Sequence, residues 1–151
     1  MSRLTDPRPP FYRDPLLWLA VVAGGIVAAA IGLWIPVADP RADSTIAWLA
    51  VSMLVIYPVL EELAFRGALQ GWLLSYDWGQ SARLGITTAN VMTTGSFVLL
   101  HFLHHPPDWA VSVAVPSLLF GFFRDRHDAV YPAIALHVVY NLFYLLAVTL
   151  L

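Results

Sequence analysis

Long apolar runs separated by short polar segments set the pattern of this chain. The first uncharged run extends from Leu16 to Val37, about 22 residues, which as a helix would cross the roughly 30 Å hydrocarbon core of a bilayer. Four more runs follow, bounded by proline, glycine or charged residues, at about residues 45–76, 83–105, 109–124 and 131–151. The pattern predicts an all-α fold: a polytopic membrane helix bundle with about five transmembrane helices.

The second run contains a proline that should disturb its helix. Pro58 has no backbone N–H and therefore cannot donate a hydrogen bond to the carbonyl of Leu54. We expect the helix to kink or loosen one turn before Glu61. That change would open space beside the Glu61 side chain, although an ordinary, well-tolerated membrane proline is the alternative.

The polar N-terminus differs from the rest of the chain. Residues 1–14 are rich in proline and arginine and are predicted to be a tether, whereas residues 15–151 form a single transmembrane domain. A cleaved signal peptide is the competing interpretation, because arginines precede the first apolar run and Ala38 follows it. That run is longer than the apolar region of a signal peptide, and Pro36 fits a cleavage site poorly, so we expect the helix to be retained.

The composition agrees with a membrane protein and narrows its chemistry. Hydrophobic residues make up 59% of the chain and charged residues 12%, with a mean hydropathy of +0.70. This composition makes the lipid bilayer the expected partner. The arginines are scattered and the net charge is −2, so we expect no binding to nucleic acid. The absence of cysteine excludes disulfides, thiolate metal sites and a cysteine nucleophile.

The distribution of arginine predicts the orientation. With five helices, the N-terminus and the loops after the second and fourth helices share one side of the membrane. That side holds Arg3, Arg8, Arg13, Arg83, Arg124 and Arg126. The other side holds only Arg41, so the positive-inside rule predicts an integral membrane protein with a cytoplasmic N-terminus.

Three charged residues interrupt the second apolar run: Glu61, Glu62 and Arg66. An unpaired charge near the bilayer centre costs from about 2.5 kcal/mol upward, which makes such groups candidates for function. Glu62 and Arg66 are four residues apart with the acid first, the favourable order for an ion pair on one helix. Glu61 points about 100° away from Glu62, so we expect its partner on another helix.

Two other helices offer such partners. Phe97 and His101 are four residues apart in the third helix, as are His137 and Asn141 in the last. An imidazole beside a carboxylate can help it deprotonate water, which contributes about 10² to 10⁴ in rate, and each hydrogen-bond donor to an oxyanion contributes on the order of 10² to 10³. Together these groups suit amide hydrolysis, although each histidine taken alone could instead make a structural interhelical hydrogen bond.

Three ordered motifs support the enzymatic interpretation: Glu61-Glu62-x-x-x-Arg66, Phe97-x-x-x-His101 and His137-x-x-x-Asn141. In this order they resemble the motifs of the CPBP family (CAAX protease and bacteriocin-processing, Abi-type) of glutamic intramembrane proteases, which includes the type II CAAX prenyl endopeptidases. The resemblance covers about residues 45–145, the expected catalytic core.

The resemblance implies a role for each motif residue. Glu61 and His101 would activate water, and His137 and Asn141 would hold the oxyanion, without a cofactor. The supporting residues would be Glu62, Arg66 and Phe97. Family members often carry eight helices, and this chain is more similar to short bacterial members linked to C-terminal protein-sorting systems. We therefore expect a protease of the bacterial inner membrane that cleaves membrane-anchored proteins near the C-terminus or a membrane segment.

Other functions remain compatible with the sequence. A zinc protease would use His101, His137 and Glu61 as ligands with water as the fourth, but the His-Glu-x-x-His motif is absent. A non-enzymatic, proton-linked carrier would also place ionisable groups in the membrane. Carriers that work by alternating access are commonly built from internal repeats, however, and five helices without a repeat do not fit that architecture. A purely structural assembly subunit is the third alternative.

The predicted depths of the site residues disagree. Counted from the cytoplasmic boundary, Glu61 lies about 15 residues and His101 about 18 residues inside, whereas His137 lies only about 6 residues inside. Helix tilt, or a connection around Asp128 that sinks into the bundle, would bring them to one level.

Overall fold

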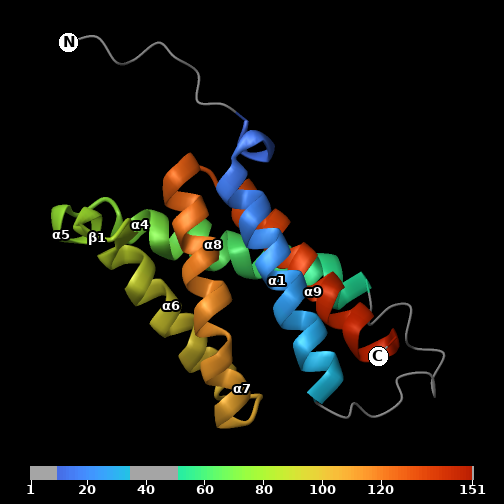
Figure 1. Cartoon of the computed structure of the whole chain (residues 1–151). Helices are drawn as coiled ribbons and strands as arrows, with labels where there is room; N and C mark the ends of the chain where they lie inside the picture. Colours follow the sequence, from blue (N-terminus) through green and yellow to red (C-terminus); the bar gives the residue numbers. More distant parts are fainter. Residues whose placement is uncertain (1–9, 35–50, 151) are drawn as a thin grey trace.

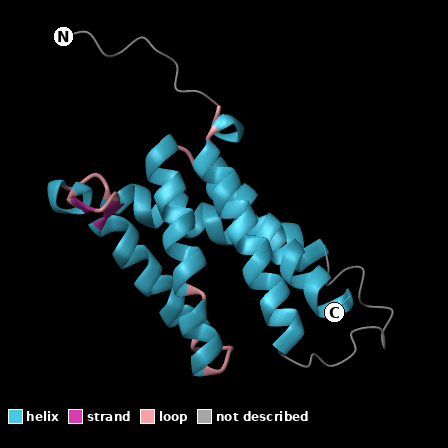
Figure 2. Cartoon of the chain, in the orientation of Figure 1, coloured by secondary structure: helices cyan, strands magenta, loops and turns pink. Residues whose placement is uncertain are grey.

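The computed structural model describes residues 10–34 and 51–150 (Figure 1). The described residues are helical apart from short connections and one two-stranded hairpin (Figure 2), which confirms the all-α prediction. Most of the predicted tether, the loop at 39–44 and the expected start of the second helix at 45–50 lie outside the described residues.

The first predicted helix is present as α1 (Pro15–Trp34) after a short 3₁₀ turn, η1 (Phe11–Arg13). Within the described ranges it is the one helix both long and apolar enough to cross a membrane, over Pro15–Leu33. A second, shorter apolar stretch covers Tyr131–Ala147. Large apolar side chains such as Leu19, Ile26 and Leu33 are exposed, as lipid-facing residues of a membrane helix bundle are.

The second predicted helix is continuous from Val51 to Leu73 but changes its winding along its length. Its segments are η3 (Ser52–Ile56), α3 (Tyr57–Glu62), η4 (Leu63–Gln70) and α4 (Gly71–Leu73). Both η3 and η4 are wide π-helical stretches, and the N–H of Tyr57 donates to the carbonyl of Ser52, five residues earlier. The loosening expected before Glu61 is therefore confirmed.

The third predicted helix starts later than expected. After α5 (Asp77–Gln80), the strands β1 (Ala82–Arg83) and β2 (Ile86–Thr87) form an antiparallel hairpin with Arg83 opposite Ile86. The turn residues Leu84 and Gly85 have positive φ angles of 54° and 81°, which a helix cannot accommodate. Helix α6 (Thr88–His101) begins where the side chain of Thr87 accepts a hydrogen bond from the Asn90 N–H.

The fourth predicted helix is two helices, α7 (Pro107–Ser112) and α8 (Ala114–His127), which meet at Val113. Helix α8 continues through the charged segment that the sequence suggested as a connection, and it ends at Asp128, whose φ is 52°. Helix α9 (Tyr131–Leu150) then starts with a proline in its first turn, where a missing N–H costs no helix hydrogen bond.

The helices pack in an order that brings the first and last together. Helix α9 packs against α1 and α8, and α8 also packs against α6 (Figure 1). Glycines allow α1 to approach α9 closely, since a Cβ atom on Gly32 would lie 2.8 Å from the carbonyl oxygen of Ala147. The buried apolar core combines α1, α8 and α9, and it consists of Leu17, Ala20, Phe120, Phe123, Ala133 and Leu136.

The start of α1 is also fixed to the end of α8 by charge. The buried carboxylate of Asp14 accepts hydrogen bonds from Arg126 and from Nε2 of His127, the latter at 3.0 Å. The Leu16 N–H donates to the same carboxylate at 3.0 Å. The hydrogen bond from Arg126 holds the pKa of Asp14 below its ordinary value. The contacts with the Leu16 N–H and His127 lower this pKa further, whereas burial acts to raise it.

The connection between α8 and α9 lies beside the middle of the second helix. A Cβ atom on Gly67 would lie 3.6 Å from Val130, and one on Gly71 would lie 3.4 Å from Arg124. Because α9 starts beside Gly67, the six residues that follow Tyr131 are enough to bring His137 to Glu62. This position of the connection agrees with one of the two expected explanations, a connection around Asp128 that sinks into the bundle.

Candidate active site

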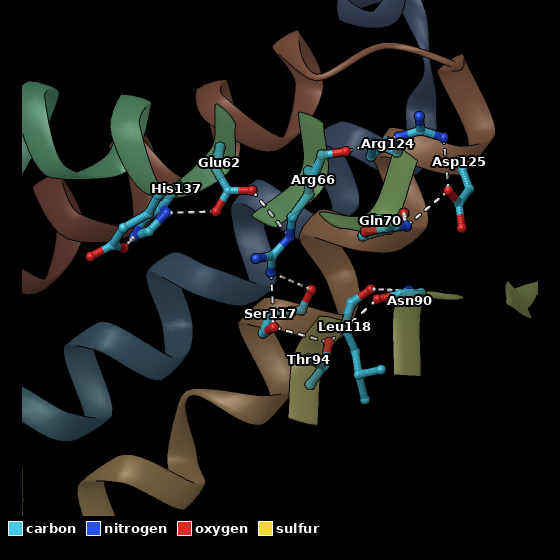
Figure 3. Close-up of polar contacts among 12 residues, drawn as sticks. Glu62, Arg66, Gln70, Asn90, Thr94, Ser117, Leu118, Arg124, Asp125 and His137 are labelled. Carbon is cyan, nitrogen blue, oxygen red and sulfur yellow. Dashed lines mark hydrogen bonds and ion pairs between the residues drawn. The ribbon is translucent and has the colours of Figure 1, made fainter. Parts of the chain in front are cut away.

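A buried polar stripe on the second helix forms the centre of the site. Glu62, Arg66 and Gln70 are spaced four residues apart, and each has 0% of its surface exposed. The predicted ion pair is confirmed: Arg66 Nε lies 3.2 Å from Glu62 Oε2 (Figure 3), at ion-pair distance although the N–H is not aligned for a hydrogen bond. Burial of both partners makes this pair costly to break.

The other oxygen of Glu62 binds a histidine from the last helix. His137 Nδ1 lies 2.9 Å from Glu62 Oε1, and because a carboxylate accepts, Nδ1 must carry the proton. The imidazole also stacks on Phe120, with ring centroids 4.9 Å apart and planes 23° apart. Glu62 and Phe120 therefore fix the orientation of His137, a contact that the sequence did not predict for Glu62.

Glu61 lies on the accessible side of this arrangement. Its Oε2 is 3.7 Å from Nε2 of His137, which is too long for a hydrogen bond, and 33% of its side chain is exposed. Among the described residues the Glu61 side chain makes no hydrogen bond. The two adjacent glutamates thus have different surroundings, as the helical geometry predicted.

His101 lies near this group without touching Glu61. Its Nδ1 is 2.9 Å from the carbonyl oxygen of Phe97, so Nδ1 is the donor, and in the neutral ring Nε2 is an unprotonated acceptor. Within the described part of the chain, no hydrogen bond or ion pair joins His101 to Glu61. The imidazole with a polar atom closest to Glu61 is instead that of His137.

Phe97 contacts both charged and aromatic members of the site. Its ring packs against His101 with centroids 4.4 Å apart, and the guanidinium carbon of Arg66 lies 5.0 Å from its centre. The same guanidinium lies 5.9 Å from the centre of Phe120. The Arg66 guanidinium thus lies within cation–π distance of two aromatic rings.

Sequence reasoning missed the residues that anchor Arg66 from behind. Its Nη2 donates to Ser117 twice, to the carbonyl oxygen at 3.0 Å and to Oγ at 2.8 Å, and Ser117 Oγ donates to Thr94 at 2.9 Å (Figure 3). A further buried amide, Asn90, donates to the carbonyl of Leu118 at 3.0 Å. The sequence feature that could have identified them is the presence of small polar residues inside apolar runs, because such residues form hydrogen bonds between helices.

Gln70 continues the polar stripe away from the glutamates. Its Nε2 donates to the carbonyl of Gly121 at 3.1 Å and to Oδ1 of Asp125 at 2.8 Å. The hydroxyl of Thr87 donates to the other oxygen of Asp125 at 2.7 Å. These contacts tie the second helix to α8 and to the start of α6.

Asn141 faces a different part of the second helix. One turn after His137, its Nδ2 donates to the carbonyl oxygen of Met53 in η3 at 2.8 Å. The structure therefore brings Glu61, Glu62 and His137 together, whereas the hydrogen bonds of His101 and Asn141 go to Phe97 and Met53. In the ranges 10–34 and 51–150, no three histidine, aspartate or glutamate side chains are grouped closely enough to hold a metal ion.

The candidate site thus consists of a buried charge pair, an accessible carboxylate and two imidazoles inside an apolar helix bundle. Over residues 43–143 the chain matches the family described as type II CAAX prenyl endopeptidase, Rce1-like, and it belongs to that family. The matched region contains all three motifs, so the predicted resemblance to CAAX proteases is confirmed and the chain is a CAAX protease-like membrane peptidase. No curated protein and no solved structure matches the chain.

Proposed function

We propose that this peptidase is a glutamic-type intramembrane endopeptidase in which Glu61 is the general base. The observation that carries the proposal is the contrast between adjacent carboxylates. Glu62 is buried between Arg66 and His137, whereas Glu61 is one-third exposed and free of hydrogen bonds within the described residues. A base must have room to hold a water and a lone pair free to take its proton, and only Glu61 meets both conditions.

In this mechanism Glu61 and His101 bind the attacking water between them. His101 accepts a hydrogen bond at Nε2, which the Phe97 contact leaves unprotonated in the neutral ring. Glu61 takes the proton as the water oxygen attacks the substrate carbonyl carbon. The C–N bond of the tetrahedral intermediate then breaks, and Glu61 returns the proton to the leaving amine.

His137 and Asn141 stabilise the oxyanion. Because Nδ1 of His137 donates to Glu62, donation from Nε2 to an oxyanion requires the doubly protonated imidazolium. Glu62 lies 2.9 Å from Nδ1 and Glu61 3.7 Å from Nε2 of the ring. The Asn141 amide has a second N–H beyond the one that binds Met53, and this N–H is the other donor.

The proposed substrate is a membrane-anchored protein, cleaved near its C-terminus or within its membrane segment. Following the resemblance to short bacterial members, we propose that the peptidase serves a C-terminal sorting system of the bacterial inner membrane, with the N-terminus cytoplasmic. Supporting roles fall to Glu62, Arg66 and Phe97. The lipid bilayer supplies the apolar surroundings that the exposed helix faces require.

The test compares the C-termini of membrane proteins in cells that carry wild type or Glu61→Gln at equal expression. Asp128→Asn, which changes an exposed carboxylate outside the site, is the matched control. We expect at least one protein to keep an uncleaved C-terminus in Glu61→Gln cells and to be processed normally in the control. If no C-terminus differs, the proposal is wrong in that host.

We also propose that the reaction uses no metal ion. Cleavage by the purified protein should therefore be unchanged after treatment with a strong zinc chelator. Loss of cleavage that added zinc restores would instead support the alternative in which His101, His137 and Glu61 bind zinc.

A further inference from the structure

The wide turn before Pro58 leaves one backbone carbonyl without a partner from its own helix. In a regular helix the Met53 carbonyl would accept from the N–H of Tyr57, but that N–H donates to Ser52 instead. In the wide turn the next donor would be residue 58, and proline has no N–H. Met53 therefore needs a donor from elsewhere, because a carbonyl in an apolar environment is costly to leave unpaired.

Asn141 supplies that donor across the helix interface. Its Nδ2 lies 2.8 Å from the Met53 oxygen, and because a carbonyl can only accept, the amide nitrogen rather than its oxygen must face Met53. The amide group is planar, so fixing one N–H also fixes the direction of the other. Asn141 follows His137 by one helical turn, so this second N–H is presented on the face of α9 that carries His137.

We propose that Pro58 and the Met53 carbonyl are positioning groups for Asn141, which extends the function proposed above. Pro58 keeps the carbonyl free of any helix donor, and the carbonyl then orients the Asn141 amide for oxyanion binding. Any other residue at position 58 would bring an N–H toward the same carbonyl. Asn141 would then share or lose its acceptor, and the amide would be free to rotate away from its working orientation.

The experiment measures kcat, KM and thermal stability for Pro58→Ala, Asn141→Ala and the double variant. We expect Pro58→Ala to lower kcat by about tenfold to hundredfold, the effect of a misplaced catalytic group, with KM unchanged. Its thermal stability should not fall, because the new N–H can bond to Met53. In the Asn141→Ala background, Pro58→Ala should have no further effect on kcat, because both changes act through one amide.

The matched control is Pro116→Ala. This proline lies in the first turn of α8, where proline is well tolerated, and it is on a different helix from Met53 and Asn141, so kcat should stay at the wild-type value. Wild-type kcat in folded Pro58→Ala would overturn the inference, as would effects of Pro58→Ala and Asn141→Ala that simply multiply.

Asn141→Asp provides a second test if Pro58→Ala does not fold. The carboxylate has nearly the shape of the amide but would place an acceptor against the Met53 oxygen, so we expect lower thermal stability than in Asn141→Ala. Equal stability of these two variants would overturn the inference. Glu61→Gln, measured in the same series, separates a failure of the proposed protease function from a failure of the positioning role. If Glu61→Gln retains cleavage, the proposed function itself is wrong. If Glu61→Gln loses cleavage but Pro58→Ala retains full kcat, only the positioning role is wrong.

Discussion

Glu61 and Glu62 differ because neighbouring side chains on a helix point about 100° apart. This places one carboxylate against Arg66 and the other at an accessible surface. Glu61→Gln should therefore abolish cleavage while the protein stays folded. Arg66→Ala should also lower the amount of protein in the membrane, because it leaves the buried Glu62 with His137 as its one remaining partner among the described residues, and breaking a buried ion pair costs about 3 to 5 kcal/mol.

Cleavage per folded molecule and membrane abundance, measured in both variants, check this asymmetry. If Arg66→Ala accumulates like wild type and loses only activity, Arg66 acts in the chemistry rather than in stabilising Glu62.

Ser117 is the residue that holds Arg66 from the opposite side, through two hydrogen bonds to Nη2. Ser117→Ala removes the hydroxyl bond to a charged group, an interaction that contributes about 1.5 to 3 kcal/mol, and it also leaves Thr94 without its donor. We expect a clearly lower unfolding temperature. Ser112→Ala, which removes an exposed hydroxyl from α7, should change stability by less than about 0.5 kcal/mol.

Sequence spacing predicted part of the site for a physical reason. The Glu62–Arg66 pair depends only on positions along one helix, and so it could be predicted from a four-residue separation. The bonds from His137 to Glu62 and from Asn141 to Met53 join helices that are far apart in sequence. Their formation depends on the level of the connection beside Gly67, which the sequence pattern does not encode locally.

At the scale of elements, hydropathy located the helices better than it located their ends. The hairpin turn at Leu84 and Gly85 could not be separated from the helix that follows it by hydropathy. The residues after Arg83 are uncharged in both, so they read as one apolar run at 83–105. The charged segment after Phe123 resembles a connection in sequence because it interrupts the apolar pattern. It remains helical because Arg124 and Asp125 bind the second helix, and Arg126 and His127 bind Asp14.

The contact between α1 and α9 depends on glycines with little space around them. A Cβ atom at Gly24 would overlap the ring of Tyr140, whose hydroxyl donates to the carbonyl of Ala20 at 2.8 Å. Gly24→Ala should therefore move that ring and destabilise the fold by about 1 to 3 kcal/mol, the usual cost of overpacking.

The control for this prediction is Gly95→Ala in α6, where a Cβ atom would meet nothing within 4 Å. Because alanine favours helix, this variant should be more stable than wild type by roughly 0.5 to 1 kcal/mol. Thermal unfolding in detergent measures both variants, and equal losses at the two positions would contradict the close packing of α1 on α9.

For the molecule as a whole, pH should act through the contact that joins α1 to α8. The hydrogen bond from Arg126 holds the pKa of Asp14 below its ordinary value of 3.8. Below pH 3.8 the unfolded chain takes up this proton before the folded protein does, so the stabilising contribution is complete above that pH and is lost as the pH falls through the lowered value.

Unfolding temperatures of wild type and Asp14→Asn should thus differ at neutral pH and converge as the pH falls below 3.8. The control is Asp108→Asn, which changes an exposed carboxylate at the start of α7 and should leave the unfolding temperature at neutral pH close to that of wild type. A gap for Asp14→Asn that stays constant down to acid pH would contradict the assigned role.

The family match begins at residue 43, yet α1 (Pro15–Trp34) covers one side of the helix that carries His137 and Asn141. A fragment cut at the matched boundary would retain every motif residue and lose the surface that supports α9. The matched region is therefore smaller than the set of helices that pack together. Experiments that transplant the matched region into another membrane protein would have to provide a replacement for α1.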